Sequence, residues 1–164
     1  MAYSEQFTPE EWQQLLDTPA LVGAAVMVCS GSGLGTMKEA FALTRGLLDI
    51  PPSFAANGLV QAVVEARQQG EASATSWQDG YQQMELDEFL RSVLDQCKAL
   101  TALLATPTRA ADADGFKRWV LGIGERVASA AREGGFLGIG GERISLEEEQ
   151  LLRDIARALQ VEAP

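Results

Sequence analysis

The segment from Glu133 to Leu159 constrains the fold more than any other part of the chain, because it contains the signals for one helix end and one helix start. A helix is expected to end at Gly134 and Gly135, since glycine readily adopts the left-handed conformation that closes a helix. After a glycine-rich connector, Ser145 is the expected N-cap of another helix, with a glutamate three residues later to complete a capping box. The segment predicts a helix–hinge–helix unit at the C-terminus.

Hydrophobic periodicity extends the helical prediction to most of the chain. Apolar residues recur every three or four positions over residues 86–104, 112–133 and 146–159, as in amphipathic helices. Four further helices are expected over residues 8–16, 18–29, 34–48 and 53–69. No segment shows the sustained alternation of a β-strand. We predict an all-α fold, a compact bundle of about seven helices that forms a single domain over residues 1–164.

Local signals define the parts between and before these helices. Residues 1–7 are expected to form a loose N-terminal arm, and residues 70–83 a polar loop or short helix. Thr8 begins a capping box with Glu11, and Phe7 is placed to staple onto Trp12.

The absence of histidine excludes many kinds of active site. It removes Ser-His-Asp and Cys-His nucleophile pairs, and every metal site that needs an imidazole ligand. The two cysteines, Cys29 and Cys97, lack the spacing of a zinc or redox motif and fit buried apolar positions, although a disulfide between them stays open. Because no signal-peptide pattern is present, we expect a cytoplasmic protein with reduced thiols.

The charge of the chain limits its partners. A net charge of −10 argues against binding nucleic acid or an anionic membrane through a general electrostatic field. The apolar run over residues 20–29 is too short to cross a bilayer. Residues 109–164 hold 10 acids and 8 bases, against 13 and 5 before them, so an anion-binding surface would be expected there. The basic residues in question are Lys117, Arg118, Arg126, Arg132 and Arg143, for which solvated helix faces are the simpler interpretation.

A glycine-rich segment, Gly31–Gly35, resembles the start of a dinucleotide-binding unit. Its GxGxG spacing differs from GxGxxG, and Pro51 and Pro52 interrupt the region where a second strand would be needed. We therefore expect a hinge between two helices, whose free amide groups leave anion binding open.

Two acidic motifs resemble metal sites but have simpler explanations. Residues 112–115 match part of a calcium loop, yet Ala110 and Leu121 would occupy ligand positions. Asp112 and Asp114 are better explained as favourable charges at a helix N-terminus. Residues 147–149 are three glutamates in a first helical turn, where a metal role would need further oxygens, with Glu142 and Asp154 the nearest candidates. We expect no metal and no cofactor.

Three stretches carry a resemblance to known proteins. The opening Phe7–Trp12 (FTPEEW), the phrase Phe116–Trp119 (FKRW) and the tail 134–159 are similar to a group of small, uncharacterised bacterial helical proteins. This resemblance implies an all-helical fold and supplies no reaction. The tail also resembles the closing segment of TerB-like tellurite-resistance domains, which are thought to bind metal through acidic residues. Here the preceding loop is glycine and apolar, with Glu142 its only acid, so no ligand is carried over.

Two classes of function follow from the sequence. The favoured one is a cytoplasmic interaction or scaffold module without catalysis, acting on a protein partner or as a homodimer. The apolar connector residues Phe136, Leu137 and Ile139 would then cover the core or contact a partner, and Trp77 would be an exposed contact.

The alternative is a small-ligand or metal-binding protein, linked to stress by the tellurite resemblance, or an enzyme with a carboxylate and arginine site between helices. The candidates for such a site are Glu39, Arg45, Glu125 and Arg126.

Overall fold

The computed structural model describes residues 2–29, 37–71, 84–106, 110–133 and 146–162. These residues contain six α-helices, two short 3₁₀-helices and no strand, which confirms the all-α prediction. The α-helices are α1 (Pro9–Cys29), α2 (Met37–Leu48), α3 (Gly58–Gln68), α5 (Leu86–Leu103), α6 (Ala110–Glu133) and α7 (Leu146–Leu159). The 3₁₀-helices are η1 (Tyr3–Gln6) and η2 (Pro52–Phe54).

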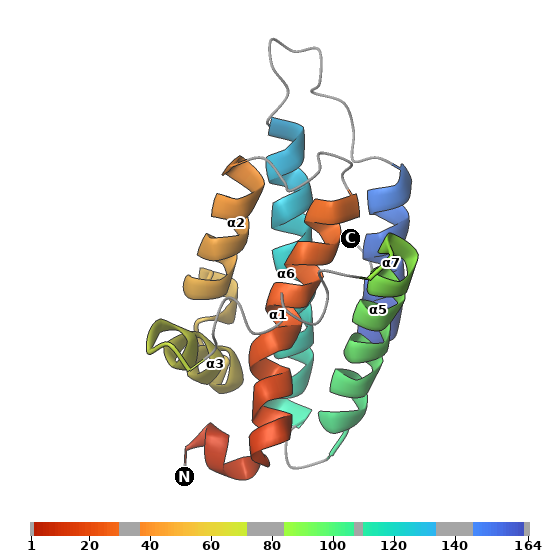
Figure 1. Cartoon of the computed structure of the whole chain (residues 1–164). Helices are drawn as coiled ribbons and strands as arrows, with labels where there is room; N and C mark the ends of the chain where they lie inside the picture. The colour runs from red at the N-terminus through yellow and green to blue at the C-terminus, as the bar shows by residue number, and fades with distance from the viewer. Residues whose placement is uncertain (1, 30–36, 72–83, 107–109, 134–145, 163–164) are drawn as a thin grey trace.

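Helices α1 and α6 form the centre of the bundle (Figure 1). Helix α2 packs against α6 on one side, and α5 and α7 pack against each other on the opposite side. Helix α3 lies below α2 and to one side of α1 in this view. Helices α5 and α7 run in the same direction, opposite to α6, so their long faces lie side by side.

The described residues contain six helices rather than about seven, because two expected helices are one. Residues 8–16 and 18–29 were expected to be separate, with Thr18 as a cap and Pro19 as a first helical residue. The structure instead has a continuous α1 with Pro19 inside it. Proline has no N–H to donate and strains a helix interior, so this continuation needs support from elsewhere.

That support comes from side chains around the proline. The hydroxyl of Thr18, which is fully buried, donates to the carbonyl of Gln14 one turn earlier (2.7 Å). Arg67 of α3 donates to the carbonyl of Leu16 from Nε (3.0 Å) and Nη2 (2.6 Å). Side chains of Thr18 and Arg67 therefore add hydrogen bonds to the turn that contains Pro19, where the sequence predicted a break.

The core is built from the predicted apolar stripes. Trp119 and Phe116 of α6 are fully buried at its centre, with ring centroids 5.5 Å apart. Every residue of α1 from Thr18 to Val26 is buried, as expected for a helix that is apolar on all sides. A Cβ on Gly23 would overlap Leu43 of α2, which shows how closely these helices approach.

The N-terminal residues pack against the bundle, in contrast to the expected loose arm. Residues Tyr3–Gln6 form η1, and the Tyr3 hydroxyl donates to the carboxylate of Asp112 in the first turn of α6. The expected staple is confirmed, since the rings of Phe7 and Trp12 lie 6.1 Å apart. The capping box between Thr8 and Glu11 is also confirmed, with both reciprocal hydrogen bonds formed.

Both cysteine thiols are free. Cys97 is buried in α5, and burial raises the pKa of its thiol to about 12. Cys29 is partly exposed at the end of α1, where burial, followed by the charges of Glu148 and Glu147, raises its pKa. Neither environment favours the reactive thiolate. Among the described helices, none is long and apolar enough to span a membrane.

Candidate binding groove between α5 and α7

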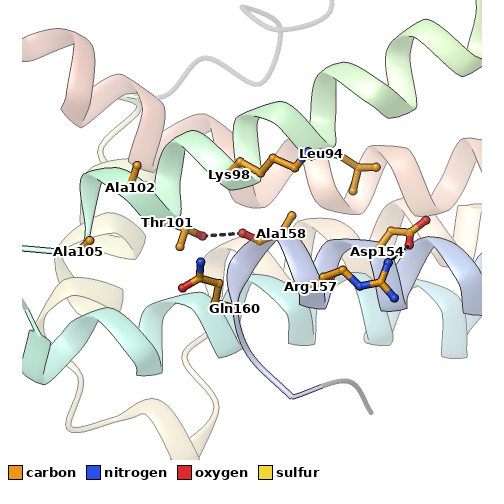
Figure 2. Close-up of a pocket in the computed structure, with 9 residues that line it drawn as sticks. All are labelled: Leu94, Lys98, Thr101, Ala102, Ala105, Asp154, Arg157, Ala158 and Gln160. Atoms are coloured by element: carbon orange, nitrogen blue, oxygen red, sulfur yellow. Dashed lines mark hydrogen bonds and ion pairs between the residues drawn. The ribbon is translucent and has the colours of Figure 1, made fainter.

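A groove of about 520 Å³ runs between α5 and α7 (Figure 2). This volume falls in the range of pockets that bind small molecules. Nine residues line it: Leu94, Lys98, Thr101, Ala102, Ala105, Asp154, Arg157, Ala158 and Gln160.

Small side chains make the space. Ala102 of α5 and Ala105 just after it line one side, and Ala158 of α7 lines the other. Leu94 adds a half-buried apolar surface at the other end. The lining therefore combines four apolar side chains with five polar or charged ones.

Thr101 fixes the middle of the groove. Its hydroxyl lies 2.9 Å from the carbonyl of Cys97 and 2.8 Å from the carbonyl of Ala158. A hydroxyl has one proton, so it donates to one of these oxygens at a time. Ala158 belongs to the last turn of α7, whose carbonyls have no donor within the helix, so this contact also caps α7 and joins it to α5.

Charged groups gather toward one end of the groove (Figure 2). The ammonium of Lys98 is exposed and has no hydrogen-bond or ion-pair partner among the described residues. The guanidinium of Arg157, 79% exposed, lies 3.4 Å from the carboxylate of Asp154. Asp154 also accepts a hydrogen bond from Gln150 (3.0 Å). The lining thus has two cations against one anion, in a chain whose net charge is −10.

Gln160 closes the other end of the groove, beyond the last residue of α7. Its backbone has a φ of 54°, in the left-handed region. The N–H of Gln160 donates to the carbonyl of Arg157 (3.1 Å), and that of Val161 to the carbonyl of Ala156 (3.0 Å). This pair of bonds is a Schellman cap, in which glycine is the usual residue at the left-handed position.

The structure brings three of the four predicted catalytic candidates near one another at the contact of α2 with α6. Nε of Arg45 lies 3.1 Å from the carboxylate of Asp49. Burial lowers the pKa of Arg126, while the charges of Asp49 and Glu125 raise it. Burial raises the pKa of the neighbouring Glu125, while Arg126 lowers it. Glu39 lies on α2, and its side chain is outside the described residues.

The positive and negative charges of this cluster at the contact of α2 with α6 balance each other. Two guanidinium groups face two carboxylates, and Arg45 and Asp49 are both more than half exposed. Glu125 and Arg126 are only partly buried. The arrangement therefore resembles a surface ion-pair network more than a site prepared for a charged substrate.

Other predicted candidates have separate outcomes. Lys117 is buried and forms an ion pair with Asp114 (3.1 Å), and Arg118 is exposed. Glu148 is only 4% exposed. The sequence had predicted an ordinary acidic first turn for residues 147–149, which does not require a buried glutamate. Asp154, named above as one of the nearest candidates if residues 147–149 held a metal, lines the groove.

Several predictions fall on parts of the chain outside the described residues. These are the hinge 31–35, the segment 72–83 with Trp77, the connector with Phe136, Leu137 and Ile139, the residues Glu142, Arg143 and Ser145, and the side chain of Arg132. Within the described residues, no group of three or more cysteine, aspartate or glutamate side chains is placed to hold a metal ion.

Comparison of the chain with protein-family models, curated proteins and solved structures finds no match in any of the three. None of these comparisons bears on the resemblances noted in the sequence.

Proposed function

We propose that the protein is a helical interaction module that binds an acidic peptide segment of a protein partner in the groove between α5 and α7. The observation that supports this most is the pairing of an apolar floor with two exposed cations, Lys98 and Arg157, on a strongly acidic chain. An unpaired ammonium beside an apolar surface offers a carboxylate both charge and a partly desolvated contact.

The length of the groove fits a short extended peptide. Lys98 and Ala105 are seven positions apart, which corresponds to about 10 Å at helical spacing. An extended chain advances about 3.3–3.6 Å per residue, so about three residues reach from the cations to the Gln160 end. The small side chains along the groove leave room for the peptide backbone.

Other occupants have less support. A second copy of this chain would bring together two molecules that each carry a net charge of −10, and their mutual repulsion opposes association. An enzyme site at Glu125 and Arg126 would have to draw on a cluster whose charges already balance. The proposal includes no reaction. It assigns the module to the cytoplasm, in keeping with its free thiols.

The test is a titration of the isotopically labelled protein with two peptide pools, followed by amide NMR spectra. Both pools contain acetylated, amidated hexapeptides of alanine, leucine, serine and glycine, with glutamate fixed at the second position in one pool and glutamine in the other. The glutamate pool should shift amide signals of residues 94–105 and 154–161 and bind more tightly than the glutamine pool. Added salt should weaken this binding, because the contact is electrostatic and exposed.

Variants locate the contact. Lys98→Gln and Arg157→Gln should each weaken binding of the glutamate pool about two- to fivefold, the usual value of an exposed charge pair. Arg118→Gln is the matched control, since Arg118 is an exposed cation of α6 outside the groove lining. Equal binding of the two pools, or equal behaviour of all three variants, would contradict the proposal.

A further inference from the structure

Two helices of this protein end in the same cap but with different residues at its left-handed position. At the end of α3, the N–H of Gly70 donates to the carbonyl of Arg67 (3.0 Å) and that of Glu71 to the carbonyl of Ala66 (3.0 Å). Gly70 has a φ of 81°. The end of α7 repeats these bonds with Gln160 in place of glycine.

A glutamine in this position is unfavourable for the fold. Its Cβ crowds the following carbonyl in the left-handed conformation, whereas glycine avoids the contact. Among the described residues, Gln160 is the only non-glycine residue with a positive φ. The cap alone therefore does not explain why a long side chain is present here.

The side chain of Gln160 reaches the groove. Figure 2 shows its carboxamide beyond the end of α7, directed toward the α5 side and lying on the far side of the Thr101–Ala158 contact from Asp154. Gln160 is exposed, and its carboxamide has no hydrogen-bond partner among the described residues. It thus presents one carbonyl and one NH₂ group to whatever occupies the groove.

We propose that Gln160 is a specificity-determining residue of the groove, whose carboxamide pairs with one backbone amide of the bound acidic peptide. A carboxamide can donate to a peptide carbonyl and accept from a peptide N–H at once, which suits the main chain of an extended segment. The amide in question belongs to the residue about three positions from the acidic side chain, given the spacing between Lys98 and the Gln160 end. This inference rests on the proposed function and deepens it.

Two substitutions separate binding from cap stability. Gln160→Gly removes the carboxamide and restores the preferred cap residue, so Tm should rise by about 2–4 °C while the glutamate pool binds about two- to tenfold more weakly. Gln160→Ala should lose the same affinity without the gain in Tm. Gly70→Gln is the matched control at the other cap, and it should lower Tm and leave binding unchanged.

Backbone-modified probes identify the amide. Four glutamate pools, each N-methylated at one amide one to four residues beyond the glutamate, are titrated against the wild type and Gln160→Gly. N-methylation at the third residue should weaken binding to the wild type about fivefold and have little further effect on the variant.

The outcomes distinguish the two proposals. If the wild type prefers the glutamate pool and Lys98→Gln weakens it, but Gln160→Gly and Gln160→Ala bind as well as the wild type, only the role of Gln160 is refuted. If the wild type does not distinguish the glutamate and glutamine pools, the proposed function fails and this inference fails with it.

Discussion

The guanidinium of Arg67 is predicted to stabilise the turn of α1 that contains Pro19. Its Nε and Nη2 both donate to the carbonyl of Leu16, at 3.0 and 2.6 Å. Burial lowers the pKa of Arg67, and the neighbouring Asp17 opposes this shift. Arg67→Met keeps much of the length of the apolar stem and removes both donors, so it tests the hydrogen bonds rather than the packing.

The expected loss of stability follows from this geometry. A hydrogen bond from a charged donor contributes about 1.5–3 kcal/mol, and because both N–H groups share one acceptor they count as one such contact. Methionine avoids the cost of burying a charge, which offsets part of the loss. We expect a net loss of about 2 kcal/mol, or a decrease in Tm of about 4–8 °C for a domain of this size.

A double-mutant cycle tests whether the contact serves the proline. Pro19→Ala restores an N–H that can donate to the carbonyl of Leu15, one residue before the carbonyl that Arg67 contacts. It also removes the clash of the proline ring with the preceding turn, so the turn should depend less on Arg67. The loss from Arg67→Met should then be about 1 kcal/mol smaller in the Pro19→Ala background. Urea unfolding of the four proteins, at one pH and one salt concentration, measures the coupling directly.

Arg91→Met serves as the control for loss of an arginine, because Arg91 is exposed on α5. It should change stability by no more than about 0.5 kcal/mol. A loss of less than about 0.5 kcal/mol for Arg67→Met, or the same loss in both backgrounds, would refute the assignment of this role to Arg67.

Three further predictions follow from buried groups. Burial raises the pKa of Glu125 above 4.5 in the folded state, so protonation contributes stability that is complete below pH 4.5 and lost as pH rises through the folded-state pKa. Glu125→Gln, which mimics the protonated form, should therefore raise Tm at pH 7 and much less at pH 4. A Cβ at Gly115 would overlap the carboxamide of Asn57, so Gly115→Ala should cost about 1–3 kcal/mol in urea unfolding. Gly122→Ala, where a Cβ meets nothing within 4 Å, should be neutral or stabilising. Cys97, buried with a thiol pKa of about 12, should react with a thiol reagent only when the protein unfolds.

Hydrophobic periodicity was sufficient to predict the helices that pack one apolar face against the core. The expected segments 86–104, 112–133 and 146–159 correspond to α5, α6 and α7 within two residues. The prediction was wrong at Pro19, because a Thr-Pro pair also occurs inside a helix when tertiary contacts stabilise the turn. Here Arg67, remote in the sequence, donates to that turn, and a tertiary contact of this kind leaves no local signal.

The catalytic candidates show a different limit. Residue type and helix position selected Arg45, Glu125 and Arg126, and the structure does place them at one contact between α2 and α6. Asp49 was not among these candidates, although its carboxylate interacts with the guanidinium groups of both Arg45 and Arg126. A neighbour of this kind decides whether a group of charged residues could bind a charged substrate or only neutralises its own charge. Its position follows only from how the helices pack.

The groove was missed for a reason that applies to helical bundles in general. Sequence patterns identify where large apolar side chains lie, whereas a groove arises where facing helices both carry small ones. Ala102, Ala105 and Ala158 give no such signal, because alanine is equally common on solvated helix faces and in tight contacts. Only the packing of α5 against α7 brings these positions to one groove. Gln160 is different, since it combines a residue type poorly suited to its conformation with a position at the end of this space. A local choice that opposes the fold is the kind of conflict expected where a binding function, rather than stability, determines the residue.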